Sequence, residues 1–308
     1  MWHEHQHKHL VFILLITLTI SLLWGCGSQT TSEAVVLPTH AELQTPTFAP
    51  EPTRSPTPAA SPTPSFTLTP SHTPIPTATE EPEGVVLYYE EYAQFELIGP
   101  DNQRVLIDVF NPDALSQPPS TDDILLTTHH HYDHYQEAFV ASFPGQQLNR
   151  RSGRIELPGV TITGIPSAHN AGDRLKPEGG TNYIFLIEMG GLRIAHFGDI
   201  GQEKLTEEQL DVLLPVDIAI TQLRNPYSDM GMENLKGFRL MEQVQPRLVL
   251  PTHASRETLQ HAAGLWSGFY SEKTSVFFTR DELNVQTQIL LLGSHASANK
   301  DIHPLAEW

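Results

Sequence analysis

The sequence predicts an α/β domain in which two β-sheets pack face to face and helices cover their outer sides. Short apolar segments joined by turns open the domain, a pattern typical of hairpins. Further along the chain, strand-like segments alternate with segments of helical periodicity, which favours layers of sheet and helix. About 224 of the 308 residues follow residue 84, and a domain of that size can bury a large core.

The first 26 residues are predicted to be a signal peptide that lies outside the fold. Residues 10–24 are almost wholly apolar, a length that suits the core of a signal peptide and is short for a bilayer-spanning helix. The tetrapeptide Leu-Trp-Gly-Cys that ends at Cys26 resembles the lipobox of bacterial lipoproteins, whose cysteine is lipidated and becomes the mature N-terminus. We therefore expect a membrane-anchored lipoprotein of the bacterial cell envelope. The alternative is an uncleaved single anchor, and both readings place the domain outside the cytoplasm.

Residues 27–84 are predicted to be a disordered linker. Proline, threonine and serine dominate this segment, and 12 of the 25 prolines lie between residues 38 and 82. Because no face of such a segment can gather enough apolar area to offset the entropy of ordering, it should form a semi-extended tether. The folded domain is expected over residues 85–295, with a C-terminal tail over 296–308.

Charge and cysteine content exclude several classes of protein. The net charge is −18, and from Val85 onward 16 basic residues face 29 acidic residues, a net charge of −13. A nucleic-acid surface needs clustered positive charge, so the expected partner is a small-molecule substrate. Cys26 is the sole cysteine, which excludes an internal disulfide and an all-cysteine zinc site. Only one apolar run approaches the length needed to span a membrane, which excludes a polytopic membrane protein.

Hairpin-like strands open the predicted domain. Residues 85–89 and 94–98 are short and apolar, and a Gly-Pro-Asp-Asn turn separates them from a third strand. This third strand, 104–110, carries apolar residues at alternate positions. A buried strand over 123–127 leads into a histidine-rich loop, and a helix over 133–142 follows it.

Strands and helices alternate along the rest of the domain. A Met-Gly-Gly turn joins two strands as a hairpin. Leucine, phenylalanine, methionine and valine recur in 233–244 at the spacing of one buried helical face. The remaining predicted strands are 159–165, 182–188, 192–197, 217–221, 247–250, 275–279 and 286–292, and the remaining predicted helices are 203–213 and 257–269.

The histidine-rich loop holds four residues that could bind metal: His129, His131, Asp133 and His134. In an extended loop, residues two apart point the same way, so His129 and His131 can share one metal ion. Asp133 and His134 open the predicted helix and can face a second ion. Imidazole and carboxylate are the ligands expected for zinc, manganese or iron.

Three later residues complete a plausible set of ligands. His169 follows the predicted strand 159–165, Asp199 follows 192–197, and His253 follows 247–250. Strand ends in a layered sheet protein converge on one rim, and such rims carry binding sites. The sequence therefore predicts that these three residues meet the histidine-rich loop.

This order of His-x-His-x-Asp-His, His, Asp and His resembles the metallo-β-lactamase superfamily over residues 85–292. The resemblance implies a four-layer αββα sandwich with a one- or two-metal hydrolytic centre. Residues 192–201, together with 217–221, look like the small single-domain branch that includes ascorbate-phosphate lactonases. The branch's frequent glycine pair after 217–221 is replaced here by Gln222 to Pro226, a loop expected to border the substrate pocket.

The resemblance also assigns roles to individual residues. It implies that His129, His131 and His169 hold one metal, that Asp133, His134 and His253 hold the other, and that Asp199 bridges the two. It also implies that Asp108 is a buried structural residue that supports the loop, and that His196 lies behind the ligands. Two divalent ions are expected, with zinc first and manganese or iron as alternatives.

The implied activity is hydrolysis, with Asp133 and Asp199 as catalytic residues. A metal-activated hydroxide would attack a carbonyl, as in a lactone or amide, or a phosphoester of a small substrate. One alternative is a phosphodiesterase, which should place Arg224 toward the metals. Another is a metal-binding envelope protein without turnover.

Several other polar and aromatic residues are weighed against plainer structural roles. Tyr132 and Tyr227 could touch substrate, although packing is the commoner role. Asn170 and Asn182 are candidates for the pocket wall. His130 is expected to point away from the ligands, and the histidines at 261, 295 and 303 are expected to be packed or solvated.

Overall fold

The computed structural model describes residues 83–173, 175 and 179–293 of the chain. The expected signal peptide with Cys26, all but the last two residues of the linker, and the C-terminal tail lie outside these described residues. Within the described ranges, no helix combines the length and apolar character needed to cross a membrane.

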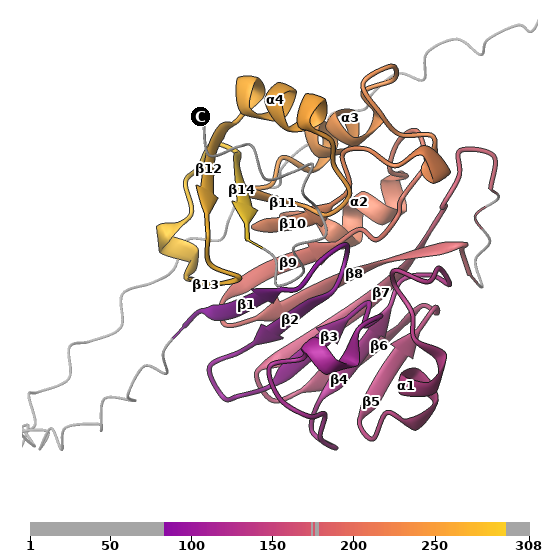
Figure 1. Ribbon diagram of the computed structural model, residues 1–308, viewed down its shortest axis with the longest axis vertical. Helices are drawn as coiled ribbons and strands as arrows, with labels where there is room; N and C mark the ends of the chain where they lie inside the picture. Colours follow the sequence, from indigo (N-terminus) through magenta and orange to yellow (C-terminus); the bar gives the residue numbers. More distant parts are fainter. Residues whose placement is uncertain (1–82, 174, 176–178, 294–308) are drawn as a thin grey trace, which may run out of the picture. The chain divides into compact units, whose positions relative to one another are not determined.

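Two sheets form the body of the domain (Figure 1). The first has six strands, in the order β13 (Ser275–Phe278), β1 (Val85–Tyr89), β2 (Phe95–Ile98), β3 (Arg104–Ile107), β4 (Ile124–Thr127) and β5 (Gln146–Asn149). The second has eight strands, in the order β12 (Ser267–Ser271), β14 (Gln288–Leu292), β11 (Leu248–Pro251), β10 (Ile218–Thr221), β9 (Leu192–His196), β8 (Asn182–Met189), β7 (Val160–Ser167) and β6 (Gly153–Leu157).

The main core lies between the sheets. Its side chains come from inward-facing positions of both sheets, among them Leu87, Phe95 and Ile107 from the first and Phe185 and Ile220 from the second. Each of these five side chains is at most 1% exposed, and full burial of such a side chain contributes about 1.5–3 kcal/mol. The alternation of apolar residues along these strands is therefore satisfied by face-to-face packing.

Helices cover the outer faces of both sheets and complete four layers. Helix α1 (Glu137–Ser142) packs through Val140 on Leu125 of the first sheet. On the second sheet, Phe238 of α3 (Lys236–Val244) and Leu259 of α4 (Arg256–Leu265) pack into one cluster that also includes Leu213 of α2 (Glu207–Leu213). Figure 1 shows α1 beside β5 and the pair α3 and α4 at the opposite edge of the view. The predicted αββα sandwich is confirmed.

All four helices differ from their predicted bounds. For α1, α2 and α4, hydrogen bonds of the chain give the reason. The helix predicted over 133–142 begins only at Glu137, because Gln136 caps it by accepting a hydrogen bond from the backbone N–H of Phe139. Thr206 and Ser255 form capping boxes and start α2 and α4. The helix predicted over 257–269 ends at Leu265, since residues 267–271 pair with β14 as a strand instead.

Strands β5, β6 and β12 are the elements that the hydrophobic pattern missed. Each lies at or next to a sheet edge and is largely exposed, so it carries no continuous apolar run. Their pairing partners determine that they are strands, with β5 parallel to β4 and β12 parallel to β14.

Candidate metal centre

The predicted ligands come together at one rim of the sandwich. The histidine-rich loop follows β4, His169 follows β7, Asp199 follows β9 and His253 follows β11. Strands β9, β10 and β11 are parallel neighbours, so the loops that follow them leave the sheet on the same side. The convergence is therefore a consequence of the sheet topology.

Asp108 anchors the histidine-rich loop through its buried carboxylate. It is fully buried just after β3, in a left-handed backbone conformation with φ of 49°. Its Oδ1 accepts a hydrogen bond from the Thr128 backbone N–H at 2.7 Å, and its Oδ2 accepts one from the Thr128 hydroxyl at 2.7 Å. The same Oδ2 lies 2.7 Å from Nδ1 of His134, which turns the other ring nitrogen, Nε2, toward the centre.

Asp133 and His134 occupy a turn and do not open α1 as predicted. The backbone N–H of His134 donates to the carbonyl of His131 at 3.0 Å, which folds the loop back on itself. This turn lets four residues of one short loop reach two different positions. His129 and His131 lie on one side, and Asp133 and His134 lie on the other.

The first group that could hold a metal ion consists of His129, His131, His169 and Asp199, which all place a ligand atom within 4.8 Å of one another. Nε2 of His129 lies 3.0 Å from Nδ1 of His131 and 3.6 Å from Oδ2 of Asp199. Nε2 of His169 lies 3.7 Å from the same carboxylate oxygen.

The second group consists of Asp133, His134 and His253. Nε2 of His134 lies 3.3 Å from Nε2 of His253, which in turn lies 3.7 Å from Oδ2 of Asp133. Oδ1 of Asp199 reaches this group as well, at 3.3 Å from His134 and 3.4 Å from His253. The two carboxylate oxygens of Asp199 therefore face one group each.

The donor sets fit divalent cations. Ligands at about 2.1 Å from a tetrahedral ion are about 3.4 Å apart, close to the spacings between the ring nitrogens and Asp199. Nε2 of His169 and Oδ1 of Asp199 are buried and make no hydrogen bond. Buried polar atoms are rarely left without a partner, and these two atoms face different groups, His169 the first and Oδ1 of Asp199 the second. One cation in each group would satisfy them.

Three histidines of the metal-free site are already in the form that binds a cation, whereas His134 is charged and must release a proton first. Burial lowers the pKa of His129, His131 and His253, so these rings are neutral, the form that coordinates metal. Burial opposes the charge on His134 too, but the carboxylates of Asp199 and Asp108 raise the pKa of its ring to about 10. Burial alone would raise the pKa of Asp199, yet the charge on His134 holds it well below its usual value.

Asp199 is held in place from three directions. Its backbone N–H donates to Oδ1 of Asn182 at 3.1 Å, and its Oδ2 accepts a hydrogen bond from Nδ2 of Asn225 at 2.6 Å. The preceding Gly198 has φ of 54°, and a Cβ there would lie 2.5 Å from Asn182 and 2.7 Å from Thr128, so the turn requires glycine. His196 accepts a hydrogen bond from the Gly198 N–H at 3.2 Å and supports the turn from behind.

A buried lysine fastens the neighbouring loops to each other. Lys236 is fully buried, and its Nζ donates to the carbonyls of Gly201 at 3.0 Å and Ser228 at 3.2 Å. Gly201 follows Asp199, and its N–H donates to the carbonyl of Ala168, next to His169. The loops that carry Asp199, His169 and Asn225 thus form one hydrogen-bonded unit.

A cavity of about 410 Å³ opens over the ligands. Its wall includes ligands from both groups, and Tyr132, Tyr227 and Arg224 stand at positions that are more than a third exposed. The expected pocket role of Asn170 and Asn182 is wrong: neither lines the cavity, and Asn182 is fully buried because it supports Asp199.

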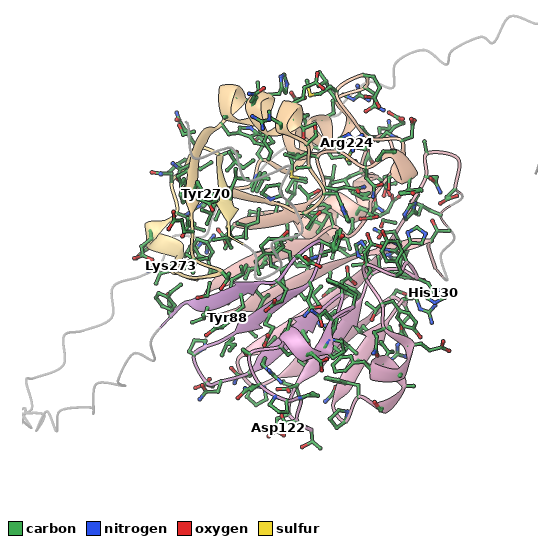
Figure 2. The ribbon with its side chains drawn as sticks, viewed as in Figure 1. Tyr88, Asp122, His130, Arg224, Tyr270 and Lys273 are labelled. Atoms are coloured by element: carbon green, nitrogen blue, oxygen red, sulfur yellow. The ribbon has the colours of Figure 1, made fainter. Side chains whose placement is uncertain are left out.

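Histidines outside the two groups have other contacts. His130, labelled in Figure 2, is exposed and packs its ring edge-on against Tyr135 at 4.7 Å. His261 packs against Phe238 in the same manner. The histidines at 295 and 303 lie outside the described residues.

Two residues at the site were missed from the sequence. Asn225 positions Asp199, and the Asn-Pro pair that begins a short helical turn was a usable signal for a capping asparagine. Tyr92 lines the cavity and packs its ring 6.0 Å from that of His253. No pattern in the sequence points to Tyr92, because it reaches the centre from the other sheet.

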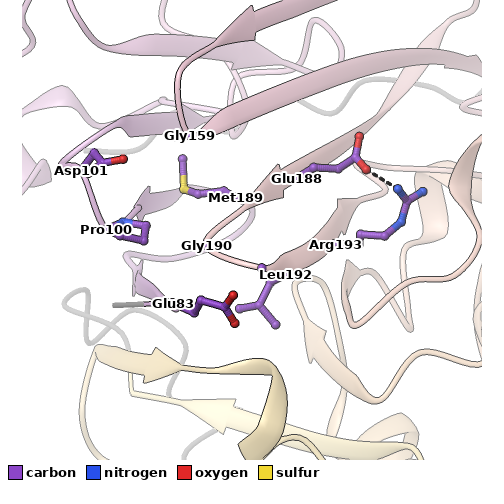
Figure 3. Close-up of a pocket in the computed structure, with 10 residues that line it drawn as sticks. Glu83, Pro100, Asp101, Gly159, Glu188, Met189, Gly190, Leu192 and Arg193 are labelled. Atoms are coloured by element: carbon purple, nitrogen blue, oxygen red, sulfur yellow. Dashed lines mark hydrogen bonds and ion pairs between the residues drawn. The ribbon is translucent and has the colours of Figure 1, made fainter. Parts of the chain in front are cut away.

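A second cavity, of about 530 Å³, lies at the opposite end of the sandwich (Figure 3). Its wall comes from the turns between β2 and β3, between β6 and β7, and between β8 and β9. Glu188 and Arg193 form an ion pair there. None of the clusters of histidine and acidic residues that could hold a metal within the described ranges lies in this wall.

Comparison with known proteins agrees with this architecture. A profile of the family described as "Beta-lactamase superfamily domain" matches residues 86–253. A "UPF0173 metal-dependent hydrolase" of Thermococcus onnurineus (strain NA1) is 29% identical over an alignment of 187 positions, which covers 53% of this chain and 81% of that protein. A solved structure of a metallo-β-lactamase superfamily protein from Thermotoga maritima is similar in fold, with a TM-score of 0.50 and 17% identity over 68% of this chain and 98% of that one. Because the family profile spans more than half of the chain, the chain belongs to the metallo-β-lactamase superfamily.

Proposed function

We propose that this protein is a metal-dependent hydrolase that cleaves a carbonyl-centred bond, as in a lactone or amide, of a small molecule. The family and the name of the Thermococcus relative support metal-dependent hydrolysis. The observation that carries the proposal is Asp199, whose two oxygens face two separate groups of ligands at the wall of a cavity.

The chemistry of the donor set supports two zinc ions. His129, His131 and His169 would hold one ion, Asp133, His134 and His253 would hold the other, and Asp199 would be shared. Divalent cations at such a site lower the pKa of water to about 7 and polarise the oxygen of the bond under attack.

The chain's own residues supply the rest of the reaction. Asp133 and Asp199 are carboxylates of the cavity wall, so they can orient a water molecule by accepting its hydrogen bonds, and Asp133 can accept its proton. When His134 gives up one proton to bind a cation, Asp108 holds the remaining proton on Nδ1 and leaves the Nε2 lone pair directed at the centre. The volume of the cavity suits a small molecule. The negative net charge of the domain disfavours a nucleic-acid substrate.

A phosphoester substrate is the second candidate, and Arg224 is the observation that favours it. The side chain belongs to the wall of the same cavity as Asp199 and His253. A guanidinium beside a metal centre is suited to phosphoryl oxygens.

We further propose that the domain is tethered at the outside of a bacterial cell envelope by lipidation of Cys26. The apolar run and the lipobox-like tetrapeptide support this location. The proline-rich linker would hold the folded domain away from the membrane surface. Replacing Cys26 by serine should release the protein from the membrane fraction. A Cys26→Ser variant that stays with the membrane would argue for an uncleaved anchor.

A matched pair of variants in one loop tests the hydrolase proposal. Protein purified without chelator is analysed for metal and assayed with zinc or manganese on lactones, amides and phosphodiesters. His131→Ala should lose metal and turnover, whereas His130→Ala, one residue earlier and outside both groups, should keep both. Metal binding without turnover on the whole panel would favour a binding protein, and equal behaviour of the two variants would refute the assigned centre.

A further inference from the structure

We propose that the substrates carry a carboxylate or phosphate group that Arg224 binds, on a planar body that lies against Tyr132 and Tyr227. This inference rests on the proposed function, because it names the class of molecule that the same cavity takes. It predicts small aromatic or otherwise planar organic anions, and not neutral molecules of the same shape.

Arg224, labelled in Figure 2, has a guanidinium without a partner in the described part of the chain. Arg104, Arg193, Arg239, Arg247 and Arg280 each bind at least one carboxylate, and Arg150, Arg151 and Arg154 each bind a side-chain or backbone oxygen. Among the described arginines, only Arg256, which does not line the cavity although Ala254 two residues earlier does, shares this lack of partners.

The backbone holds Arg224 in a fixed place. The N–H groups of Leu223 and Arg224 both donate to the carbonyl of His253, at 2.8 and 3.0 Å. Asn225, the next residue, donates to Asp199 and exchanges two backbone hydrogen bonds with Met230. The loop that carries Arg224 is therefore hydrogen-bonded to two of the proposed ligands. These bonds fix the position of the Arg224 backbone relative to the centre.

The charge around the cavity gives Arg224 a special position. Among the described residues that form the wall, it is the one lysine or arginine, and the acidic side chains Asp133 and Asp199 are already engaged with the histidines there. The domain as a whole is strongly acidic. A single unpaired guanidinium in such surroundings attracts an anion at short range, and its planar fork matches a carboxylate or a phosphate.

Two tyrosines provide an apolar surface beside this cation. Tyr132 is 82% exposed and Tyr227 is 78% exposed, so both rings are in water in the free protein. Both line the cavity, and they come from different elements, the loop after β4 and the short helical turn after β10. Covering exposed aromatic rings by a planar ligand removes apolar area from water, which favours binding.

Calorimetric binding to the zinc-loaded protein provides the first test. The probes are benzoate, phenyl phosphate and neutral benzamide. Arg224→Gln should weaken both anions about 10- to 100-fold, since a charge-assisted hydrogen-bonded pair is lost, and should leave benzamide unchanged. Arg224→Lys should restore part of the affinity. Arg256→Gln, the same change at an exposed arginine outside the cavity, should have no effect.

The probes also separate the two possible anions and the role of the rings. A loss confined to phenyl phosphate would identify a phosphate site, and a loss confined to benzoate a carboxylate site. Tyr227→Ala should weaken all three aromatic probes, whereas Tyr227→Phe should not. Unchanged anion binding in Arg224→Gln would overturn the inference.

Measurements of ester hydrolysis distinguish a failure of this inference from a failure of the proposed function. If matched anionic and neutral esters are both cleaved and Arg224→Gln changes neither KM, the hydrolase proposal stands and the anion site fails. If no ester is cleaved but Arg224→Gln abolishes anion binding, the anion site stands and the hydrolase proposal fails.

Discussion

Strands β3 and β4 lie side by side and parallel, and buried polar side chains stand at both of their ends. At the beginning of the strands, Arg104 binds Glu96 at 3.1 Å and Asp123 at 2.6 Å, and it donates to two backbone carbonyls. At the other end, Asp108 binds Thr128 and His134, and the network continues to Asp199.

The two ends differ in how the buried charges are balanced. Around Arg104, the guanidinium lies between two carboxylates that accept further hydrogen bonds, Glu96 from Ser116 and Asp123 from Ser120, although its Nε has no acceptor. At the other end, two acceptor-capable atoms, Nε2 of His169 and Oδ1 of Asp199, are buried without a hydrogen bond, each among candidate metal ligands. The Arg104 end therefore has its cation built into the protein, whereas the other end, the open end, has atoms left to bind one.

Asp199→Ala should produce the largest effect, because it opens both ligand groups at once. We expect loss of both metal ions and a fall in hydrolysis of at least about 1000-fold, while the domain stays folded. Zinc at 100 times its dissociation constant should stabilise the wild-type protein by about 2.7 kcal/mol, and the variant should lose this shift. Metal analysis and thermal unfolding with and without zinc measure both effects. A variant that still binds two ions would contradict the shared role of Asp199.

Arg104→Met should act on stability and leave metal binding alone. Removing the guanidinium leaves two buried carboxylates without their cation, which costs about 3–5 kcal/mol. The exposed pair of Arg154 and Glu156 is the control, since Arg154→Met should cost less than about 1 kcal/mol. Urea unfolding of the metal-free proteins gives both values. If Arg104→Met instead lowered the zinc content of the folded protein, the two ends of the strands would not be independent.

The ligands could be predicted from the sequence because they follow strands whose ends must meet. His169, Asp199 and His253 each come after an apolar run, and the parallel order of β9, β10 and β11 brings the last two together. Supporting residues were harder to predict. Asn182 begins a predicted strand and Asn225 lies in a predicted loop, and their hydrogen bonds to Asp199 join positions 17 and 26 apart in sequence.

Fold prediction failed where pairing, and not hydrophobicity, determines the structure. Residues 267–269 were predicted as the end of a helix, yet hydrogen bonds to β14 make residues 267–271 a strand. Residues 133–136 read as the first turn of a helix, yet Asp133 and His134 are drawn into the second ligand group. Local propensity could not reveal either outcome, because both depend on contacts with distant residues.

Asp108→Asn should give a smaller and more selective effect than the other changes, confined to one ligand group. Asparagine tolerates the left-handed backbone at this position, so the loop should keep its path. Its carboxamide, however, places an NH₂ group against either the Thr128 N–H or the ring of His134. The second case favours the tautomer of His134 that carries its proton on Nε2, where it blocks coordination.

In Asp108→Asn, we therefore expect a fall of about 10- to 100-fold in the zinc affinity of the group formed by Asp133, His134 and His253. The zinc affinity of the group around His129 should not change. At limiting zinc, the variant should hold one ion where the wild-type protein holds two. Asp122→Asn, an exposed change in the loop before β4, is the control. Equal weakening of both groups would mean that Asp108 supports the whole loop through Thr128 and does not act through His134, and the open end of β3 and β4 would then behave as a single unit.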